Sequence, residues 1–329
     1  PIPDLKLNDG TQLPAIGFGT YKLNGQAGVE TIVQAMRNGY RLLDSAFNYE
    51  NEGAVGAAVR ASGLARDTIR VTSKLPGRRH RYAEARATVE ESLFRTGLDH
   101  LDIYLIHWPN PKTGLYVEAW QALVDAQKAG LIRTIGVCNF LPEHIERIIA
   151  QTGVAPAINQ VELHPYFPQA GQLAFDRSKG VVTQAWSPLG RANDIITNET
   201  IGTIAGRHGR TIPQIILRWQ VQQGAVPLPK ATSDERQIEN RSVFDFELSQ
   251  GDMETIASPL RPDHTEAILS RFISVVRATV RGNFIIAGLQ GAIGGIAFWS
   301  LGVNGAVLWG TIMAFLSLLP AVGAAIVWM

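Results

Sequence analysis

Cysteine is almost absent from this chain, and its one thiol, at Cys138, excludes an intrachain disulfide. A reducing compartment is therefore permitted. The charge also lacks a dominant sign, because 30 Lys and Arg stand against 29 Asp and Glu, a formal net charge of +1. This balance gives no reason to expect a nucleic-acid partner. The first residues, Pro1–Asp4, lack the basic-then-apolar pattern of a secretion signal, so none is expected.

Ionisable side chains are missing altogether from the last 48 residues, 282–329. Crossing a bilayer takes roughly 20 predominantly apolar residues. This run could supply two spans, about Phe284–Val303 and Ala306–Met329. We therefore predict a soluble domain over residues 1–262, followed by a membrane-like helical tail over residues 263–329.

Three arginines, Arg271, Arg277 and Arg281, precede or flank the start of the first predicted span. The positive-inside rule would keep them, and the soluble domain with them, on the cytoplasmic side of a membrane. If the tail is genuine, we expect a cytoplasmic domain that is associated with a membrane through residues 282–329.

The soluble part alternates short apolar runs with longer segments of helical apolar spacing. Eight runs predict strands, over Ala15–Gly19, Arg41–Ser45, Ile69–Lys74, Leu101–His107, Thr134–Asn139, Ile158–Glu162, Val182–Ser187 and Val226–Pro229. Helices are expected to follow them, for example over Gly28–Asn38, Glu52–Ser62, Ala83–Thr96, Tyr116–Lys128 and Pro142–Gln151. Such alternation implies parallel strands, and eight units in roughly 250 residues fit a closed (β/α)8 TIM barrel.

An open nucleotide-binding sheet is the alternative fold. It should carry G-x-G-x-x-G after its first strand, but Gly17-Phe18-Gly19 is not followed by the third glycine. The leading segment Leu5–Leu13 has an Asp-Gly turn between alternating residues. This pattern predicts an N-terminal β-hairpin that caps the bottom of the barrel.

Four polar side chains fall at or just after consecutive strand ends, where parallel barrels carry catalytic groups. Asp44, Lys74 and His107 close three of the predicted strands, and Tyr49 lies in the loop after the first. Reduction of a carbonyl group by hydride needs a proton at the oxygen. A Lys cation would lower the pKa of a nearby Tyr, and a carboxylate would pair with that cation. A His could then hydrogen-bond the carbonyl oxygen.

Each of these residues also has a purely structural interpretation. A loop Tyr is often filler, a strand-end Asp often caps the next helix, and a strand Lys often forms an ion pair at a barrel rim. Their joint occurrence at consecutive strand ends favours the catalytic interpretation.

The motifs around these residues resemble the aldo-keto reductase family from about Leu5 to Ser258, in particular its bacterial diketogluconate-reductase-like members. The similar segments are Leu43-Asp44-Ser45-Ala46 with Tyr49, Asn51 and Glu52, then Thr72-Ser73-Lys74, then Leu105-Ile106-His107-Trp108-Pro109. The resemblance implies an NADPH-dependent enzyme that reduces an aldehyde or ketone. Its implied catalytic tetrad is Asp44, Tyr49, Lys74 and His107.

The same resemblance implies a nicotinamide cofactor extended across the barrel mouth. Asn139 and Gln160 would hold its carboxamide, and Trp186 would stack on its ring. Lys230 and Arg236 would pair with a 2′-phosphate, which NADPH has and NADH lacks. The other implied contacts are Gly19, Thr20, Tyr21, Cys138, Ser187, Leu189, Glu239 and Asn240.

Two positions depart from the family's pattern. Cys138 stands where Ser is usual, and a thiol is a weaker donor, although the residue can equally be a buried small apolar side chain. Ala231 also replaces a frequent Ser, which removes a phosphate contact and leaves some tolerance of NADH open. Trp186 keeps its alternative interpretation as a core residue.

Apolar and aromatic residues are the candidates for the substrate pocket: Tyr21, Phe47, Trp108, Phe140 and Tyr166. They suit a small carbonyl compound. The family's last loop, which closes this pocket, is replaced after Met253–Ala257. No metal site is predicted, and the barrel is expected to be monomeric.

The tail resembles one internal stretch of the autoinducer-exporter or PerM-type permeases. The similar segments are Arg277–Asn283, Gly288–Gly291, Gly302–Ala306 and Leu308–Gly310. This indicates a fusion or a chimera joined near Pro259–Thr265, with too few spans for a transport pathway. Two other functions stay open: a non-catalytic cofactor-sensing module attached to a membrane protein, and a permease fragment.

Overall fold

The computed structural model describes residues 2–192, 194–258, 290, 292–302, 304–305, 307–309 and 311–312. The chain divides into two units, Pro1–Leu260 and Arg261–Met329. The expected boundary between residues 262 and 263 lies outside the described ranges.

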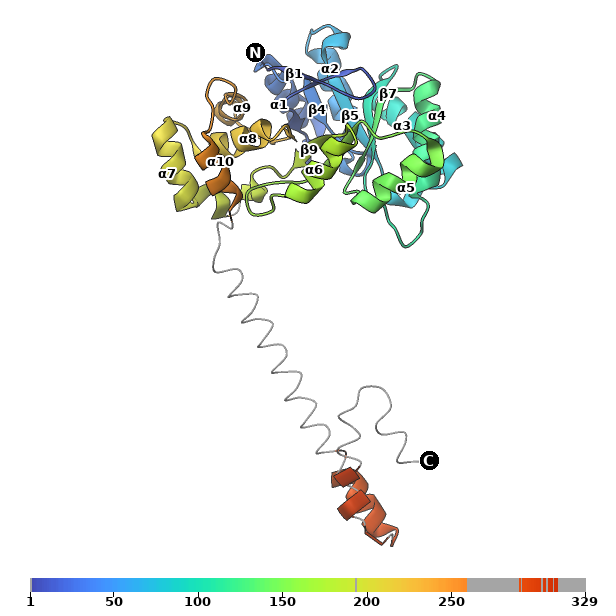
Figure 1. Ribbon diagram of the computed structural model, residues 1–329. Helices are drawn as coiled ribbons and strands as arrows, with labels where there is room; N and C mark the ends of the chain where they lie inside the picture. Colours follow the sequence, from blue (N-terminus) through green and yellow to red (C-terminus); the bar gives the residue numbers. More distant parts are fainter. Residues whose placement is uncertain are drawn as a thin grey trace. The chain divides into compact units, whose positions relative to one another are not determined.

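A single parallel sheet organises the described part of the first unit (Figure 1). Its strands run in the order β10-β9-β8-β7-β6-β5-β4-β3, so neighbours in the sheet are also neighbours in the sequence. The strands are β3 Phe18–Gly19, β4 Leu42–Asp44, β5 Arg70–Leu75, β6 Leu101–Ile106, β7 Ile132–Cys138, β8 Ile158–Glu162, β9 Val182–Trp186 and β10 Val226–Pro227.

Backbone hydrogen bonds join the last strand of this sheet to the first. The Gly17 amide donates to the Pro227 carbonyl and the Gly19 amide to the Pro229 carbonyl, each at 3.0 Å. The sheet therefore closes on itself, and the expected (β/α)8 fold is confirmed.

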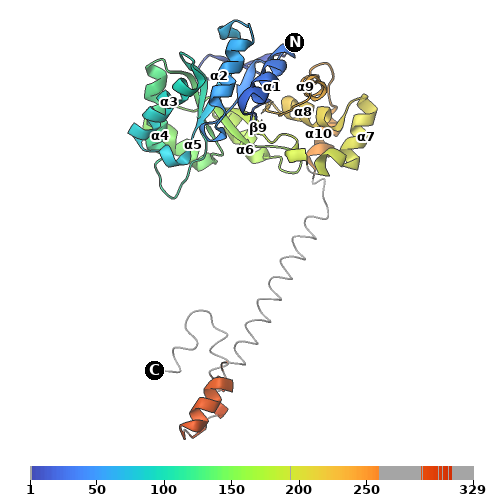
Figure 2. The ribbon, with the colours of Figure 1, turned by 180° about the vertical axis from the view of Figure 1, so that it is seen from behind.

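Helices lie outside the strands in both views of the molecule (Figures 1 and 2). One helix follows each strand from β3 to β8, and α8, which follows α7, completes the unit after β9. The helices are α1 Gly25–Arg37, α2 Glu52–Ala61, α3 Tyr82–Thr96, α4 Tyr116–Lys128, α5 Pro142–Thr152, α6 Ala170–Ser178, α7 Glu199–His208, α8 Ile212–Gln222, α9 Asp234–Arg241 and α10 Gln250–Ala257.

Side chains of alternate strand positions fill two separate apolar regions, as period-two strands require. Leu42, Leu105 and Ile158 belong to the cluster inside the barrel. Their strand neighbours Leu43 and Ile106 belong to the larger cluster between the strands and the helices. The barrel interior is thus a packed core, which leaves the strand ends for polar chemistry.

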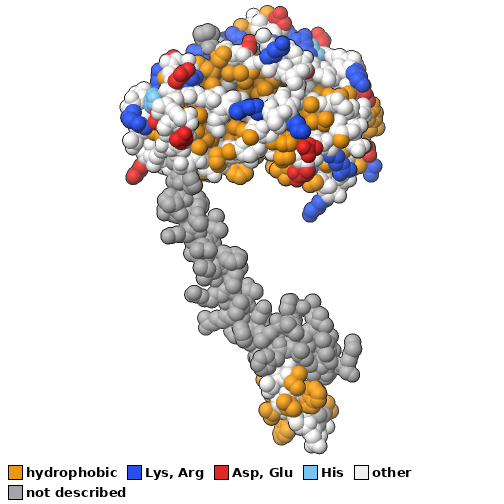
Figure 3. Space-filling model, in the orientation of Figure 1, with side chains coloured by type: hydrophobic (Ala, Val, Ile, Leu, Met, Phe, Trp, Pro, Cys, Tyr) orange, Lys and Arg blue, Asp and Glu red, His pale blue; other side chains and the backbone are white. Residues whose placement is uncertain are grey.

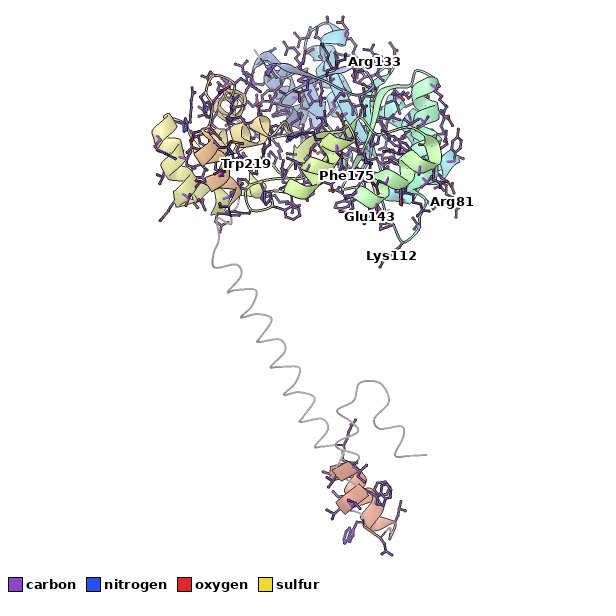
Figure 4. The ribbon with its side chains drawn as sticks, viewed as in Figure 1. Arg81, Lys112, Arg133, Glu143, Phe175 and Trp219 are labelled. Atoms are coloured by element: carbon purple, nitrogen blue, oxygen red, sulfur yellow. The ribbon has the colours of Figure 1, made fainter. Side chains whose placement is uncertain are left out.

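The predicted N-terminal hairpin is confirmed, with β1 Asp4–Lys6 paired antiparallel to β2 Gln12–Pro14. It covers the N-terminal ends of the strands, because Thr11 Oγ1 lies 2.9 Å from Thr134 Oγ1 near the start of β7. Arg133, beside it, and Lys112, in the loop after β6, lie at opposite ends of the barrel (Figure 4). The mouth is therefore at the carboxyl ends of the strands.

The described residues of the second unit are helical over Ala292–Ser300, and Gly302 and Gly305 have positive φ angles of 74° and 83°. Apolar side chains gather at this described segment (Figure 3), where Trp299 and Val307 are 77% and 84% exposed. No helix in the described part of the chain has both the length and the apolar character to cross a membrane. Of the predicted span Phe284–Val303 the structure describes residues 290 and 292–302, whereas most of the predicted span Ala306–Met329 lies outside the described residues.

Candidate active site

The four residues of the predicted tetrad converge at the carboxyl ends of β4, β5 and β6. Lys74 Nζ donates to Asp44 Oδ2 at 2.7 Å and to the Ser45 carbonyl at 2.9 Å. The same ammonium lies 5.0 Å from the centroid of the Tyr49 ring. The ring of His107 lies edge-on to Tyr49, with 6.0 Å between the centroids. A phenol, a cation, a carboxylate and an imidazole thus share one end of the barrel.

The Lys74–Asp44 pair keeps the lysine charged in a buried place. Burial of Lys74 lowers the pKa of its ammonium. The adjacent Asp44 carboxylate acts in the opposite direction, and the net shift of the pKa is upward. Removing either partner would leave an unpaired buried charge, which is costly. Asp44 therefore holds the Lys74 ammonium as a fixed cation beside the Tyr49 ring.

Burial and the cation act in opposite directions on Tyr49. Burial raises the pKa of the phenol, Lys74 lowers it, and the net shift is upward. The sequence predicted the effect of the cation but not the larger effect of burial. In this structure Tyr49 therefore keeps its proton at neutral pH, as a proton donor must.

His107 is a neutral imidazole at physiological pH. Burial lowers its pKa to about 3, with a smaller contribution from the Lys74 charge. A neutral ring can donate one N–H to an oxygen atom without carrying charge. His107 is thus suited to orient a carbonyl group, not to protonate it.

Side-chain amides hold the segment that carries Tyr49. Asn51 Nδ2 donates to the Thr20 carbonyl at 2.6 Å, and Ser45 Oγ donates to Asn51 Oδ1 at 2.7 Å. Asn24 Nδ2 donates to the Tyr49 carbonyl at 3.2 Å. Sequence reasoning gave Asn24 no role, since an Asn before a helix is usually read as its cap, and here the side chain makes no cap bond.

Gln160 contacts the tetrad directly. Its Nε2 donates to Asp44 Oδ1 at 2.8 Å and to Gln184 Oε1 at 3.0 Å. Both N–H groups are then used, so Oε1 of Gln160 is left as an acceptor. Gln184, which is fully buried, was missed by sequence reasoning, because its contact with Gln160 is visible only in three dimensions.

Asn139 and Ser187 adopt left-handed backbone conformations, with φ angles of 59° and 48°. Such strain is concentrated at functional sites. Both residues were expected within strands, which is wrong, because this conformation ends β7 at Cys138 and β9 at Trp186. Trp186 Nε1 donates to Asn139 Oδ1 at 2.9 Å, and Asn139 Nδ2 donates to the His107 carbonyl at 3.1 Å.

The expected phosphate-binding residues gather around α9. Lys230 and Arg236 are exposed, and Ser233 caps the helix by accepting from the Arg236 amide. Burial and the nearby Lys22 charge lower the pKa of Lys230. Lys22, missed from the sequence, therefore belongs to the same positive region.

The other expected cofactor residues in this part of the barrel are buried or half-buried. Glu239 accepts from Thr211 Oγ1 at 2.6 Å, and Asn240 is 5% exposed. Thr20 donates from Oγ1 to the Asp44 carbonyl, while Gly19 and Leu189 are half-buried. Burial raises the pKa of the Cys138 thiol, which agrees with its interpretation as an unreactive small residue.

Two of the expected pocket residues are at the mouth and two are not. Tyr21 and Trp108 are 53% and 49% exposed, and the Tyr21 ring lies edge-on to Tyr49. The assignment of Phe140 to the pocket is wrong, because its fully buried ring packs on Tyr116 of α4. Phe47 is also a correction, since its buried ring stacks on the Arg95 guanidinium of α3 at 3.8 Å. Both rings serve the packing of helices.

The remaining candidate, Tyr166, accepts a hydrogen bond from Asn198 Nδ2 at 3.1 Å. Its partner comes from the segment just before α7, on the far side of β9 in the sequence. Tyr166 therefore connects the loop after β8 to the loop after β9.

A closed parallel barrel with proton-donating and charge-stabilising groups at its carboxyl mouth is the construction of a barrel enzyme. Comparison with known proteins gives the family. The chain belongs to the Aldo/keto reductase family, whose model matches residues 15–260. The expected family membership is thereby confirmed.

Relatives with known names support this membership. The chain is 48% identical over 256 residues to 2,5-diketo-D-gluconic acid reductase B from Corynebacterium sp., covering 78% of this chain and 92% of the relative. It is 41% identical over 253 residues to glyoxal reductase from Bacillus subtilis, covering 77% and 91%. This chain is similar to both proteins, and both are reductases by name.

Solved structures agree with the fold. An aldo/keto reductase from Brucella melitensis has a TM-score of 0.76 and 38% identity, covering 79% of this chain and 100% of that one. A Bombyx mori aldo-keto reductase in complex with NADP has a TM-score of 0.73 and 30% identity, covering 79% and 94%. Such complexes are consistent with the cofactor expected from the sequence.

A second family model, described as AI-2E family transporter, matches residues 247–329. This confirms the predicted resemblance of the tail to a permease. The two matches overlap over residues 247–260.

Proposed function

We propose that this chain uses NADPH to reduce a small aldehyde or ketone to an alcohol, with Tyr49 as the proton donor. The observation that carries the proposal is the buried Lys74–Asp44 ion pair at 2.7 Å beside the Tyr49 ring. The Lys74 ammonium, which is held by Asp44 and the Ser45 carbonyl and lowers the pKa of Tyr49, is well placed to stabilise negative charge on the phenol.

Bound NADPH would supply the hydride. Gln160 presents Oε1 as an acceptor for the carboxamide N–H groups, because its own N–H groups are used by Asp44 and Gln184. Asn139 has one N–H left after its bond to the His107 carbonyl, so it would donate to the carboxamide oxygen. Lys230 and Arg236 would pair with the 2′-phosphate, and Trp186 would support the ring.

The proton would move from the Tyr49 hydroxyl to the carbonyl oxygen as negative charge develops there. Lys74 stabilises the phenolate that results, and Asp44 holds the ammonium in place. His107, neutral because of its burial, would donate a hydrogen bond to the same oxygen. Each of the four residues would then have one stated task.

The test uses the full chain in detergent, with a panel of small aldehydes and the loss of NADPH absorbance as the signal. Tyr49→Phe should lower kcat by about 10²- to 10⁴-fold, the usual size of a general-acid contribution. It should leave the dissociation constant of NADPH, measured by fluorescence, within about twofold, since the ring is kept. The same assay with NADH tests the role of Lys230 and Arg236.

Full activity of Tyr49→Phe would exclude the proposed proton donor. Tight NADPH binding without turnover by the wild type would instead favour the non-catalytic sensing module. The intact set of Asp44, Tyr49, Lys74 and His107 is the reason to prefer the enzyme.

We further propose that residues 263–329 attach a cytoplasmic, monomeric barrel to a membrane as a fused permease-like segment. The support is the match to the transporter family together with the absence of charge over residues 282–329. The exposed apolar side chains of the described tail residues, such as Trp299 and Leu301, agree with a lipid contact.

A further inference from the structure

A carboxylate of α6, Asp176, is fully buried and contacts a side chain of β8. Its side-chain donors in the described part of the chain are neutral: Gln172 Nε2 at 2.8 Å, Thr183 Oγ1 at 2.9 Å and Asn159 Nδ2 at 3.2 Å. Burial raises the pKa of Asp176, these donors lower it, and the net value is about 6. The carboxylate is therefore ionised at neutral pH and can only accept hydrogen bonds.

This acceptor fixes the orientation of the Asn159 side-chain amide. The reverse orientation would place Asn159 Oδ1 against the Asp176 carboxylate and the Phe140 carbonyl, which are both acceptors. The observed orientation directs Nδ2 to both of them, at 3.2 Å and 3.1 Å. It also leaves the buried Oδ1 of Asn159 without a hydrogen-bond partner in the described part of the chain, which is costly. The two contacts of Nδ2 therefore outweigh the lost contact of Oδ1.

The Phe140 carbonyl belongs to the turn that carries Asn139. Asn139 has a φ of 59°, a strained conformation for a residue other than glycine, so its surroundings must hold it there. The backbone amide of Asn139 donates to the Gln160 carbonyl at 3.0 Å. The carbonyl of the next residue, Phe140, accepts from Asn159. Two consecutive residues of β8, Asn159 and Gln160, therefore hold this turn at both of its ends.

We propose that Asn159, oriented by Asp176, is a positioning residue for the nicotinamide end of the cofactor. It holds the turn at Asn139 in the conformation that presents the remaining Asn139 N–H to the carboxamide. The inference rests on the proposed use of NADPH. Successive strand residues face opposite sides, so Asn159 faces α6 while Gln160 contacts the Asp44 carboxylate. Asn159 therefore acts through Asn139 and does not itself touch the cofactor.

The experiment separates the two halves of the cofactor. Calorimetry measures the dissociation constants of NADP⁺ and of adenosine 2′,5′-bisphosphate, which has the 2′-phosphate but no nicotinamide. The full chain is used in detergent at pH 8, where Asp176 is ionised. The variants are Asn159→Ala, Asn139→Ala as the reference for a lost carboxamide contact, and Thr183→Val. Thr183→Val is the matched control, because it removes a donor to Asp176 but leaves the bond from Asn159 to the turn.

The measured quantity is the dissociation constant of the bisphosphate divided by that of NADP⁺. We expect this ratio to fall about threefold to tenfold in Asn159→Ala, the range of a displaced neutral hydrogen bond. Asn139→Ala should lower the ratio at least as much. Thr183→Val should leave the ratio within about twofold, although it lowers the stability of the fold in urea. Loss of a buried donor is thereby separated from loss of the positioning contact.

An unchanged ratio in Asn159→Ala, or an equal fall in Thr183→Val, overturns the inference while the reductase function stands. If Asn159→Ala does not fold, Asp176→Asn takes its place, because it keeps the side-chain size and frees the orientation of Asn159. An unchanged ratio in that variant overturns the inference equally. An unchanged ratio in Asn139→Ala would remove the proposed carboxamide contact, and a wild type that binds neither ligand would remove the NADPH function itself.

Discussion

Two buried histidines respond to acid in a way that exposed ones would not. Burial lowers the pKa of His80 to about 4 and that of His107 to about 3. His80 is 1% exposed, and neither of its ring nitrogens has a hydrogen-bond partner in the described structure. Protonating a buried ring that has no hydrogen-bond partner costs the full desolvation free energy of the new charge.

At His80 this has a measurable consequence. The unfolded chain takes up a proton near the ordinary pKa of about 6.5, but the folded chain takes it up only near pH 4. The stability contributed by the neutral ring is thus complete above about pH 6.5. It falls as the pH drops toward 4, by at most about 1.4 kcal/mol per pH unit.

We therefore expect His80→Leu to lose less stability than the wild type between pH 7 and pH 5. Urea unfolding of both proteins at the two pH values measures this. Equal losses would mean that His80 is hydrated or paired in solution. His107→Leu is not a suitable companion, because that residue belongs to the proposed site.

The convergence of the four residues of the predicted tetrad could be predicted from the sequence, because three of them stand at strand ends and Tyr49 follows in the loop after β4. Phe140 could not be placed, because the left-handed turn at Asn139 sends the next side chain toward α4 instead of the mouth. Asn159 and Gln184 were passed over for another reason. Their partners, Asp176 and Gln160, are identified by three-dimensional contact, not by spacing.

At the level of elements, the join between β10 and β3 differs from the other strand pairs. Gly17 and Gly19 donate to Pro227 and Pro229, but proline has no N–H to return. The join therefore has donors from one strand only. Close packing offsets the missing hydrogen bonds at this join. A Cβ at Gly17 would lie 2.6 Å from Leu228 Cδ2 and 2.9 Å from Leu42 Cδ2.

Gly17→Ala should therefore destabilise the barrel, by about 1–3 kcal/mol for an overpacked core position. The control is Gly206→Ala in α7, where no atom lies within 4 Å of the added Cβ. That change should stabilise the protein by about 0.5–1 kcal/mol, since alanine suits a helix better than glycine. Equilibrium urea unfolding distinguishes them, and a neutral or stabilising Gly17→Ala would contradict the packing argument.

The order and type of the strands followed from apolar patterning, but their ends did not. Ala15 was predicted to open the first barrel strand, yet its amide donates to the Pro3 carbonyl of the hairpin at 2.9 Å. The start of another strand also differs, because β7 begins at Ile132, two residues before the predicted start at Thr134. Such ends depend on partners distant in sequence, which a local pattern does not contain.

At the scale of the whole molecule, the two family matches overlap over residues 247–260, and the structure shows that much of this overlap belongs to the barrel. α10 lies within the overlap and packs on the barrel, with Ile256 fully buried and the Trp219 indole donating to the Met253 carbonyl at 3.3 Å. Asp252 accepts from His208 at 3.0 Å. The reductase unit therefore includes residues at least to Ala257.

Ending the chain after Ser258 should separate the proposed reductase activity from the proposed membrane attachment. We expect the shortened protein to remain in the supernatant after cell membranes are sedimented, while the full chain sediments with them. Its kcat/KM for a small aldehyde should stay within about threefold of the full chain, because α10 is retained and the tail contributes no proposed catalytic group. A shortened chain that still sediments would refute the membrane attachment.

The join between β3 and β10 also constrains how the protein is made. The ribosome synthesises Gly17 and Gly19 near the start of the chain, and the carbonyls that they meet belong to Pro227 and Pro229. Until that late segment has left the exit tunnel, the first strand has a neighbour on one side only. This edge of the first strand therefore cannot be paired until residues 227–229 emerge, and until then it stays exposed to chaperones and to other nascent chains.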